Sequence, residues 1–502
     1  MFKKILIANR GEIAVRVMRT AREMGIRTVA VYSEVDRDAR HVELAEEAVC
    51  IGAPPPGESY LNIPRIIAAA HETNCEAIHP GYGFLSENPD FSEAVEKAGL
   101  VFIGPPPSAM RLLGNKIESR VLAQEHNVPV TPGATFDEPD PVAVGKMAEK
   151  IGWPVLVKAA AGGGGKGMRV VHRAADLPMA LEGAAREAKS AFGDATIYLE
   201  KYLTRPRHIE FQVFCDNHGN AVHLGERECS IQRRHQKIIE ESPSVVVTPE
   251  LRQKMGDAAL RVVQAAGYRN AGTVEFLFDR GQFYFLEVNA RLQVEHPVTE
   301  FRTGEDLVEW QLHIACGEPL PKSQNEITFR GHAIECRIYA EDPKAGFLPS
   351  SGKIHVLEEP HIPGVRVDSG IRAGSEVSVY YDPILSKVIS YADTRENAIR
   401  KMNQALTHYV ILGVATPIEI LRDILAHPKF MAGDLSTHFL DDHMPDWKPI
   451  EPSECDLAAA LLAATRASAV GTRTGNGNAK QGIPSPWLTL GAWRIAEGEQ
   501  RP

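Results

Sequence analysis

The sequence predicts a multidomain protein that combines the α/β and α+β classes. Its 502 residues exceed what one hydrophobic core usually serves, so three or so domains are expected. The chain opens with a buried strand, an amphipathic helix and a second strand, which is the βαβ order of α/β proteins. From Gly331 to Tyr391 it changes to short alternating strands separated by Gly and Pro, which indicates a mixed α+β domain.

The composition is that of a globular enzyme, with 44% hydrophobic and 24% charged residues. A net charge of -10 argues against non-specific nucleic-acid binding, although local basic pockets are compatible with it. The seven cysteines are scattered and include no Cys-x-x-Cys pair, so neither a zinc site nor a disulfide framework is indicated. Since no apolar run suits a signal peptide or a membrane span, we expect a soluble, cytoplasmic protein.

The opening βαβ unit has strands predicted at Ile5–Ala8 and Thr28–Tyr32, with a helix over Glu12–Met24 between them. The turn Asn9–Gly11 lacks the pattern Gly-x-Gly-x-x-Gly, so NAD binding is disfavoured. A glycine-rich loop at His79–Asn88 follows a brief strand. Such a loop either faces a ligand or simply forms a tight turn, and the sequence leaves both interpretations open.

A second glycine-rich segment follows a boundary at Pro105–Pro107. After a helix over Ile117–His126 and a strand over Val155–Lys158, Gly162–Gly167 holds five glycines in six residues. We interpret it as a mobile lid whose backbone closes over phosphates, with a floppy surface hairpin as the alternative. It is not a Walker P-loop, because no Gly-Lys-[Ser/Thr] opens a helix. The strand Tyr198–Leu203 then offers backbone groups to a flat base.

Cationic residues gather after the alternating strand predicted at His208–Val213. The run Arg233–Lys237 gives an acidic protein a local surplus of positive charge, which carbonate or phosphate would need. A solvated basic loop is the alternative, and proximity to the acids described next would decide between the two. Cys229 is interpreted as a small packed side chain.

The stretch Phe283–Pro297 changes from a strand pattern to closely spaced ionic residues without a break. A partner strand, Thr273–Asp279, carries Glu275. If the hairpin loop spans Arg280–Gln282, Glu275 lies opposite Glu287, whereas a two-residue loop would place these acids on opposite faces; we favour the longer loop. At period two, one face of the second strand carries Phe283, Phe285, Glu287, Asn289 and Arg291.

Two carboxylates on one face repel each other unless a cation lies between them. The oxygens of Glu275, Glu287 and Asn289 suit a hard ion such as Mg²⁺ that holds substrate phosphates. Exposed edge-strand glutamates are the alternative. Because Arg291 joins these three polar residues on one hairpin, we favour the metal and phosphate interpretation.

The last third of the chain is expected to begin a new sheet at Gly331–Ala340. Arg337 is the one charge of interest there, with a surface position as the default expectation. Helices are predicted at Arg395–Thr407 and Pro417–Ala426. From about Trp447 the composition loosens, which indicates a linker or docking tail.

Taken together, the chain resembles the biotin carboxylase component of biotin-dependent carboxylases of the acyl-CoA or pyruvate type, within the ATP-grasp superfamily. The resemblance runs from Ile5 to about Asp446. Five motifs carry it in family order: Ala8–Ala14, His79–Asn88, Gly162–Met168, Arg233–Lys237 and Glu287–His296.

The resemblance implies four regions. Residues 1–114 would form a Rossmann-like N-terminal domain, and residues 115–330 an ATP-grasp domain whose mobile glycine-rich lid spans about 131–203. Residues 331–446 would form the mixed α+β C-terminal domain, and residues 447–502 the tail. A homodimer is also implied, with contacts at Arg16, Arg19 and Glu23.

The resemblance also implies the site residues. ATP and its adenine would be bound by Lys116, Lys158, Gly163, Gly164, Gly165, Glu200, Lys201, Leu203, His208, Gln232 and His235. Mg²⁺ or Mn²⁺ would be held by Glu275, Glu287 and Asn289. Bicarbonate would be gripped by Lys237, Arg291, Gln293 and the backbone of Val294.

The implied chemistry makes Glu295 the general base for bicarbonate, which gives carboxyphosphate and ADP. Carboxyphosphate would collapse to CO₂ and phosphate, the phosphate would take the ureido proton of biotin, and Arg337 would stabilise the resulting enolate. Since the sequence has no Met-Lys-Met biotinylation site, the biotin is expected on a separate biotin carboxyl carrier protein, and the tail is expected to dock a carboxyltransferase or carrier subunit.

Two rival functions are weighed. Another ATP-grasp ligase would share the lid and the metal hairpin, but it would not be expected to keep Arg-Arg-His-Gln-Lys together with Gln293, Val294 and Glu295. A catalytically dead scaffold is disfavoured because no position with an expected catalytic role is lost. The final acceptor, an acyl-CoA or an oxo-acid, belongs to the carboxyltransferase.

Overall fold

The structure is a computed structural model of the chain, and it describes residues 1–136, 140–159, 168–192, 196–451, 453–455, 458 and 460. Two compact units divide the chain, Met1–Trp447 and Lys448–Pro502, and every element discussed below belongs to the first. The lid glycines Gly163, Gly164 and Gly165 lie outside the described residues.

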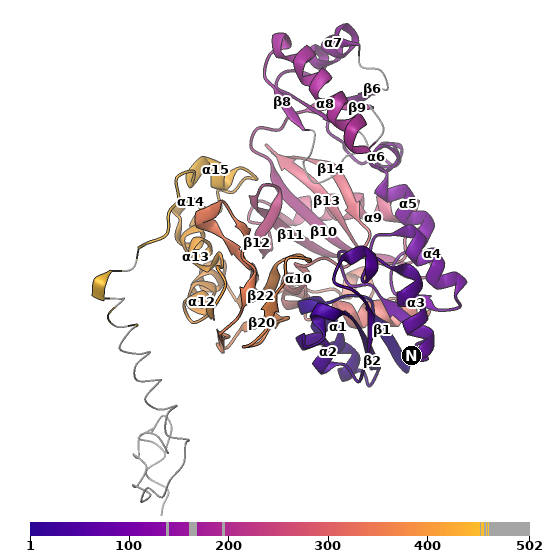
Figure 1. Ribbon diagram of the computed structural model, residues 1–502. Helices are drawn as coiled ribbons and strands as arrows, with labels where there is room; N and C mark the ends of the chain where they lie inside the picture. Colours follow the sequence, from indigo (N-terminus) through magenta and orange to yellow (C-terminus); the bar gives the residue numbers. More distant parts are fainter. Residues whose placement is uncertain are drawn as a thin grey trace, which may run out of the picture. The chain divides into compact units, whose positions relative to one another are not determined.

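A five-stranded parallel sheet, in the order β3-β2-β1-β4-β5, forms the N-terminal part (Figure 1). Leu6 of β1 packs into one hydrophobic cluster, and its neighbours Ile5 and Ile7 pack into another, so this strand is buried on both faces. The predicted βαβ opening is confirmed. The elements are β1 (Lys4–Ile7), α1 (Gly11–Glu23), β2 (Arg27–Ser33), α2 (Arg40–Leu44), β3 (Glu47–Gly52), α3 (Ile63–Glu72), β4 (Ala77–His79), α4 (Pro89–Lys97) and β5 (Val101–Phe102).

A four-stranded antiparallel sheet, in the order β6-β9-β7-β8, forms with α7 and α8 a small layered unit (Figure 1). Its core includes Val155, Val157 and Leu199 from the strands and Leu181 from α8. The elements from the boundary onward are α5 (Pro107–Gly114), α6 (Lys116–Glu125), β6 (Gly133–Phe136), α7 (Pro141–Ile151), β7 (Val155–Ala159), β8 (Arg169–Val171), α8 (Leu177–Phe192) and β9 (Ile197–Lys201).

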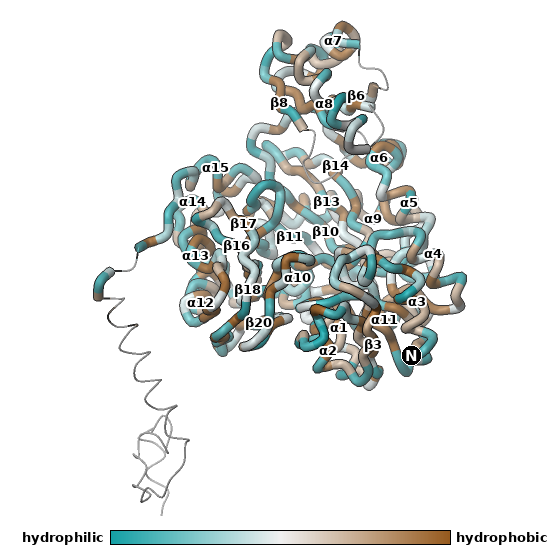
Figure 2. Tube along the Cα trace, viewed as in Figure 1, coloured by the Kyte–Doolittle hydropathy of each residue, from teal (hydrophilic) through white to brown (hydrophobic). Residues whose placement is uncertain are grey.

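An eight-stranded sheet, in the order β14-β13-β10-β11-β12-β15-β22-β20, carries most of the polar residues of interest. Its first part, with the helices that accompany it, comprises β10 (Arg207–Cys215), β11 (Ala221–Arg233), β12 (Gln236–Ser242), α9 (Pro249–Ala265), β13 (Asn270–Asp279), β14 (Gln282–Asn289), α10 (His296–Thr303) and α11 (Leu307–Ala315). Figure 2 shows hydrophobic colour along much of α13 and hydrophilic colour along many outer loops.

The expectation that a new sheet begins at Gly331 is wrong. Strand β15 pairs with β12, with Glu240 opposite Glu335 and Ile239 opposite Cys336, so one sheet continues across this point. The backbone groups along β12 thereby find partners that an isolated edge would lack. The remaining elements are β15 (His332–Tyr339), β16 (Glu341–Asp342), β17 (Leu348–Pro349), β18 (Gly352–Lys353), β19 (Val356–Glu358), β20 (Val365–Ser369), β21 (Glu376–Val377), β22 (Ile384–Ala392), α12 (Arg395–Thr407), β23 (Val410–Leu412), α13 (Ile418–Ala426), α14 (Pro428–Met431) and α15 (Phe439–His443).

The β13–β14 hairpin has the predicted pairing but not the predicted loop. Asp279 pairs with Gln282, so the loop has two residues, Arg280 and Gly281, both with positive φ; the longer loop was wrong. Glu275 nevertheless lies opposite Glu287. Phe276 pairs with Phe285, and the register shifts by one residue between this pair and the pair Glu275–Glu287. This bulge at Leu286 places Phe285 and Glu287 on opposite faces, so the single face expected for both was also wrong.

Candidate active site

A buried ammonium group lies at the centre of the site. Lys237 Nζ donates hydrogen bonds to Glu210 Oε2 at 2.5 Å, Glu275 Oε1 at 2.8 Å and Glu295 Oε1 at 2.8 Å. Burial opposes the charged form, but the three carboxylates outweigh it and hold the pKa of Lys237 above its ordinary value. The solvated-loop interpretation is therefore wrong for this lysine, whose side chain is 11% exposed.

The fully buried Glu295 bridges two cations. Its Oε1 accepts from Lys237, and its Oε2 accepts from Arg337 Nη2 at 2.9 Å. Burial would raise the pKa of Glu295, but Lys237, Arg337 and then Arg227 hold it well below its ordinary value, so the carboxylate is ionised at neutral pH. Glu295 is the residue immediately before α10, and its side chain makes no capping hydrogen bond to that helix.

Arg337 lies on β15 and is 7% exposed, so the surface position expected for it is wrong. Its Nε donates to Glu240 Oε1 at 2.5 Å and its Nη2 to Glu295, so two carboxylates from other segments compensate the buried guanidinium. This pairing holds the pKa of Arg337 above its ordinary value despite burial.

Two supporting residues were missed from the sequence. Arg227 is fully buried on β11 and donates to Glu210 Oε1 at 2.5 Å, Gln212 Oε1 at 2.8 Å and Thr299 Oγ1 at 3.1 Å. Glu210 thus lies between the guanidinium of Arg227 and the ammonium of Lys237. The available signal was a polar alternation, Glu210 and Gln212 in one strand with Arg227 in the next, which is unusual for strands buried on both sides.

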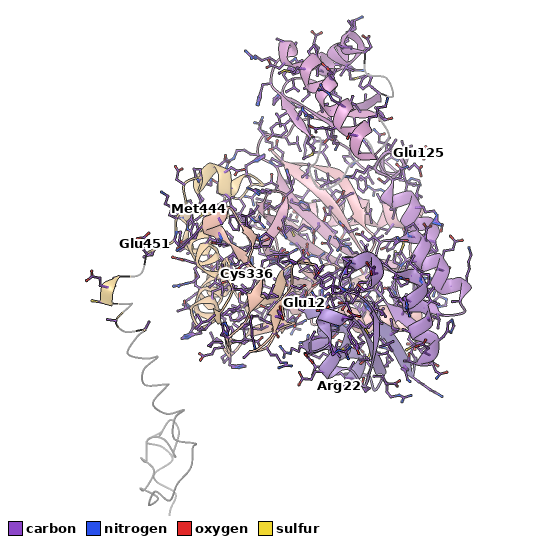
Figure 3. All side chains as sticks on the ribbon, viewed as in Figure 1. Glu12, Arg22, Glu125, Cys336, Met444 and Glu451 are labelled. Atoms are coloured by element: carbon purple, nitrogen blue, oxygen red, sulfur yellow. The ribbon has the colours of Figure 1, made fainter. Side chains whose placement is uncertain are left out.

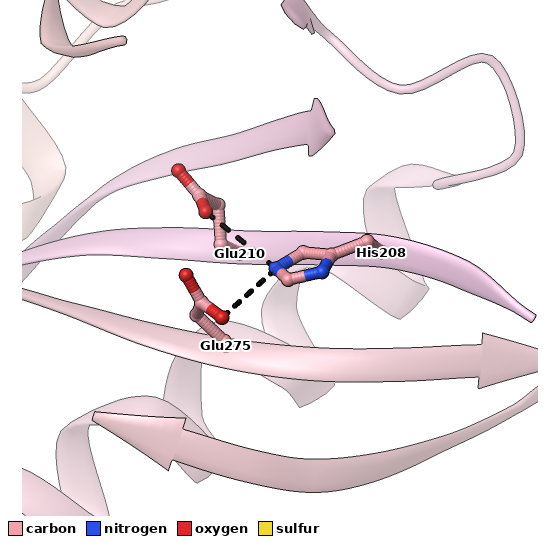
Figure 4. Close-up of side chains that lie close together, drawn as sticks. All are labelled: His208, Glu210 and Glu275. Atoms are coloured by element: carbon pink, nitrogen blue, oxygen red, sulfur yellow. Dashed lines mark ion pairs between the residues drawn. The ribbon is translucent and has the colours of Figure 1, made fainter. Parts of the chain in front are cut away.

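His208 extends the cluster, as Figure 4 shows. Its Nε2 lies 3.0 Å from Glu275 Oε2 and 3.8 Å from Glu210 Oε2, and its Nδ1 lies 3.1 Å from Gln232 Nε2. The two expected nucleotide-pocket residues His208 and Gln232 are therefore in contact. His235 is instead exposed at the turn between β11 and β12, with φ of 67°, so the structure does not bring it into this buried contact.

The candidate metal ligands lie side by side on the hairpin. Glu275 pairs with Glu287, and Thr273 pairs with Asn289 on the same face. Burial and then the charge of Glu275 raise the pKa of Glu287, while Lys116, with Nζ 3.7 Å from Glu287 Oε2, lowers it. Because Glu287 lies beside a second carboxylate, a bound cation would stabilise its ionised form. Two carboxylates with an amide oxygen are ligands that fit Mg²⁺.

A cavity of about 210 Å³ lies beside Glu287 and is lined by both candidate phosphate lysines, Lys116 and Lys158. Lys158 Nζ donates to Glu200 Oε1 at 2.7 Å, so this acid, expected near adenine, supports the lysine. Lys201 Nζ donates to the carbonyls of Gly152 and Trp153, and Leu203 lies partly exposed after the end of β9. Arg120 also lines the cavity, so it presents three cations to an anionic ligand.

A second cavity, of about 280 Å³, lies beside Arg337. Tyr82, Gly83 and Phe84 line it, so the glycine-rich loop His79–Asn88 faces a cavity and is more than a tight turn. Other lining residues include Glu12, Val294, Tyr339 and Tyr381. The cavity thus combines several aromatic rings with two guanidinium groups, those of Arg10 and Arg337, which suits a flat polar ring.

The residues expected to bind bicarbonate do not all lie in the ammonium cluster. Gln293 Nε2 donates to Glu275 Oε1 at 3.0 Å, and Gln293 Oε1 lies 3.5 Å from Lys237 Nζ, so Gln293 belongs to it. Arg291 is held to one side, where its Nε donates to Glu87 Oε2 at 2.9 Å and its Nη2 to Asn289 Oδ1 at 3.0 Å. Glu87 is a further residue that the sequence did not reveal.

Family models match three consecutive parts of the chain. Residues 1–110 match the biotin carboxylase N-terminal domain, residues 115–323 the ATP-binding domain of the carbamoyl-phosphate synthase L chain, and residues 335–442 the biotin carboxylase C-terminal domain. A pyruvate carboxylase subunit of Methanothermobacter thermautotrophicus is 53% identical over 443 residues, which cover 88% of this chain and 90% of that protein. The chain belongs to the biotin carboxylase family.

Other relatives and solved structures agree. The biotin carboxylase of Allochromatium vinosum is 50% identical over 88% of this chain and 98% of its own length, whereas this chain covers 65% of the longer propionyl-CoA carboxylase alpha chain of Caenorhabditis elegans. The biotin carboxylase domain dimer of Hydrogenobacter thermophilus 2-oxoglutarate carboxylase, in complex with MgADP and bicarbonate, has a TM-score of 0.85 and 46% identity and covers 90% of this chain and 100% of that one. The Campylobacter jejuni biotin carboxylase–β-γ-ATP complex has a TM-score of 0.84 and 47% identity and covers 88% and 99%.

Membership confirms the expected three-domain fold class and the expected activity. Biotin carboxylase is an ATP-dependent ligase that carboxylates biotin in the first half-reaction of biotin-dependent carboxylases. The rival ATP-grasp ligases share the central ATP-binding match, but the flanking N- and C-terminal matches belong to biotin carboxylase. Within the part of the chain that the structure describes, no helix has the length and apolar character needed to cross a membrane.

Proposed function

We propose that this biotin carboxylase carboxylates the biotin of a separate biotin carboxyl carrier protein, with bicarbonate and ATP as the other substrates. The observation that carries the proposal is the ionised, buried Glu295, held at 2.8 Å by Lys237 and at 2.9 Å by Arg337. A carboxylate in this position is able to remove the bicarbonate proton on one side and lies next to a guanidinium suited to biotin on the other.

The first step assigns bicarbonate to Lys237, Gln293 and the backbone of Val294. Glu295 takes the bicarbonate proton, a bicarbonate oxygen forms a bond to the γ-phosphorus of ATP, and the bond from that phosphorus to ADP breaks. Lys237 would interact with both bicarbonate and the carboxylate of Glu295. Bound bicarbonate therefore weakens the interaction between the Lys237 ammonium and Glu295. The pKa of Glu295, which the cations hold low, then rises at the moment when a stronger base is required.

The phosphates of ATP are assigned to the cavity lined by Lys116 and Lys158, with Glu275, Glu287 and Asn289 holding the metal. Mg²⁺ bound there would supply positive charge to the transferred phosphoryl group. Lys116 adds a cation on the side of Glu287, and Lys158 is aligned by Glu200. These cations would stabilise the negative charge that develops on the phosphoryl group during its transfer.

The second step assigns the ureido ring of biotin to the aromatic cavity beside Arg337. Carboxyphosphate separates into CO₂ and phosphate, the phosphate takes the ureido proton, and the ring nitrogen attacks CO₂. The Arg337 guanidinium, oriented by Glu240 and Glu295, favours the enolate oxygen that forms on the ring.

The test is ADP release by the purified protein, measured with and without free biotin and bicarbonate. We expect rapid release only when both are present. ATP cleavage that ignores both substrates would refute the proposed function and favour another ligase.

We also propose a homodimer, in which α1 contributes fewer contact residues than the sequence predicted. Arg16 is buried and donates to Glu300 Oε1 at 2.5 Å and Asp306 Oδ1 at 2.9 Å, so its charge is compensated within the chain. Arg19 and Glu23 keep exposed surface on the same helix and are the better candidates. Sedimentation of the parent and of Arg19→Glu tests this, with a smaller species expected for the variant.

The domain limits 1–114, 115–330, 331–446 and 447–502, and a cytoplasmic location, stay predictions. We propose that the tail docks a carboxyltransferase or carrier subunit. Co-purification of that subunit with the full chain, and its loss when residues 456–502 are deleted, is the expected result. Unchanged co-purification would contradict the docking role.

A further inference from the structure

Lys387 is a fully buried lysine on β22 to which the proposed function gives no role. Its Nζ donates a hydrogen bond to the carbonyl oxygen of Val294 at 2.7 Å. Two acids lie farther away: Glu12 Oε2 at 3.4 Å and Asp368 Oδ2 at 4.0 Å. The closest contact of this buried charge is therefore a backbone carbonyl next to the candidate general base.

The two acids are not arranged to make close ion pairs with Lys387. Asp368 already accepts from two of the three Arg366 nitrogens, Nε at 2.8 Å and Nη2 at 2.6 Å, and lies 3.2 Å from Arg19. Glu12, labelled in Figure 3, is buried, and burial raises its pKa to about 7. Since a buried ammonium requires compensation, the acids explain why the charge is tolerated. They do not explain why it lies so close to the Val294 carbonyl.

Lys387 lies directly behind the aromatic cavity. It pairs across the sheet with Arg337, and its Nζ is 5.6 Å from the centre of the Tyr82 ring. Tyr82, Arg337 and Val294 all line the cavity. The lysine therefore contacts the wall of the site from the protein side and has no exposed surface of its own.

The Val294 carbonyl belongs to the peptide unit that continues into Glu295. A peptide unit is planar, so fixing its oxygen fixes the direction of the following N–H and Cα. We propose that Lys387 is a positioning residue, whose ammonium holds the Val294–Glu295 peptide in the orientation that aligns the bicarbonate site and the carboxylate of Glu295. This inference rests on the proposed function, because it assigns Lys387 to the bicarbonate step and not to nucleotide binding.

The test replaces Lys387 with Met, which keeps the aliphatic stem and removes the donor. The matched control is Lys401→Met, because Lys401 Nζ also donates to a backbone carbonyl, that of Tyr391 at 2.9 Å, but on α12. The measurements are kcat and the KM values for bicarbonate and for ATP in biotin-dependent ADP release, together with MgADP affinity by calorimetry.

We expect Lys387→Met to raise the KM for bicarbonate by about 10- to 100-fold and to lower kcat, with MgADP affinity and the KM for ATP within about twofold of the parent. The Lys401→Met control should keep all four values. A folded Lys387→Met protein with an unchanged KM for bicarbonate would overturn the inference, as would equal losses for bicarbonate and ATP.

Lys387→Arg keeps the test decisive if the Met variant does not fold. It retains the charge that Glu12 and Asp368 require, but in a fully buried site the broader guanidinium cannot replace the ammonium without displacing the Val294 carbonyl. We expect a rise of about tenfold in the KM for bicarbonate alone, and an unchanged value overturns the inference. A parent protein whose ATP cleavage ignores bicarbonate would instead refute the proposed function.

Discussion

Replacing Glu295 with Gln removes the proposed base and one charge-assisted hydrogen bond, and leaves the other contacts of the cluster in place. The parent carboxylate accepts one hydrogen bond from Lys237 at 2.8 Å and one from Arg337 at 2.9 Å. A glutamine of the same shape has one acceptor oxygen, so its amide nitrogen must face one of these cations. The loss of one charge-assisted hydrogen bond costs about 1.5–3 kcal/mol of stability. Lys237 keeps Glu210 and Glu275, and Arg337 keeps Glu240, so the fold should persist.

The effect on turnover should be larger than the effect on stability. A positioned general base contributes about 10²- to 10⁴-fold to rate, which corresponds to about 3–5 kcal/mol. We therefore expect kcat for biotin-dependent ADP release to fall by at least about 100-fold at saturating bicarbonate. MgADP affinity, measured by calorimetry, should stay within about twofold of the parent, because Glu295 does not line the lysine cavity.

A matched control is Glu241→Gln. Glu241 is also a buried glutamate held by two basic side chains, with Oε2 2.7 Å from His332 Nε2 and 2.7 Å from Arg395 Nε, but it lies outside the site. This variant should lose stability without a comparable loss of kcat. Two results would refute the reasoning: a Glu295→Gln enzyme with more than about a tenth of parental kcat, or an equal loss in the Glu241→Gln control.

Three further predictions concern other parts of the site. Arg337→Ala should lower biotin-dependent ADP release by about 100-fold or more without weakening MgADP binding, and near-parental turnover would remove its assigned role. Glu287→Gln should raise the Mg²⁺ concentration required for half-maximal activity by about tenfold or more, and an unchanged Mg²⁺ titration would contradict the metal assignment. Lys237→Met should destabilise the protein by about 3–5 kcal/mol at pH 8, measured by denaturant unfolding. In the parent, Glu275 and Glu295 have pKa values well below the ordinary range and stay ionised from pH 8 to pH 5. Without Lys237, fewer cations oppose burial and the pKa values of these glutamates rise above those of the parent, so the native variant binds more protons than the native parent as pH falls and its deficit should shrink at pH 5; a deficit that is constant or grows would count against the buried cluster.

The local pattern of the sequence was sufficient for many single elements. Alternation and helical periodicity predicted the opening βαβ unit, the helix over Arg395–Thr407 and the hairpin acids, because these features depend on residues close together in the chain. The pairing of Glu275 with Glu287 was also correct, although for the wrong reason. A two-residue loop and a bulge at Leu286 together give the same pairing, and a bulge leaves little trace in a hydrophobic pattern.

The placements that were missed belong to residues whose partners are distant in sequence. Arg337 was assigned to the surface by default, but Glu240 and Glu295, from other segments, compensate its charge inside the sheet. Arg227 and Lys387 likewise find their partners on other segments, and only folding brings them to Glu210 and to the Val294 carbonyl. A buried charge is stable only with its partners in place, so its burial cannot be read from one segment.

The sequence by itself determined the family, the order of the elements and the acids of the hairpin, since these depend on local composition and spacing. The tertiary structure decided the continuous sheet from β12 to β15, the cations that surround Glu295, and the lysine that holds its peptide. The physical reason is that backbone hydrogen bonds and buried ion pairs join segments far apart in the chain, and these contacts exist only after folding.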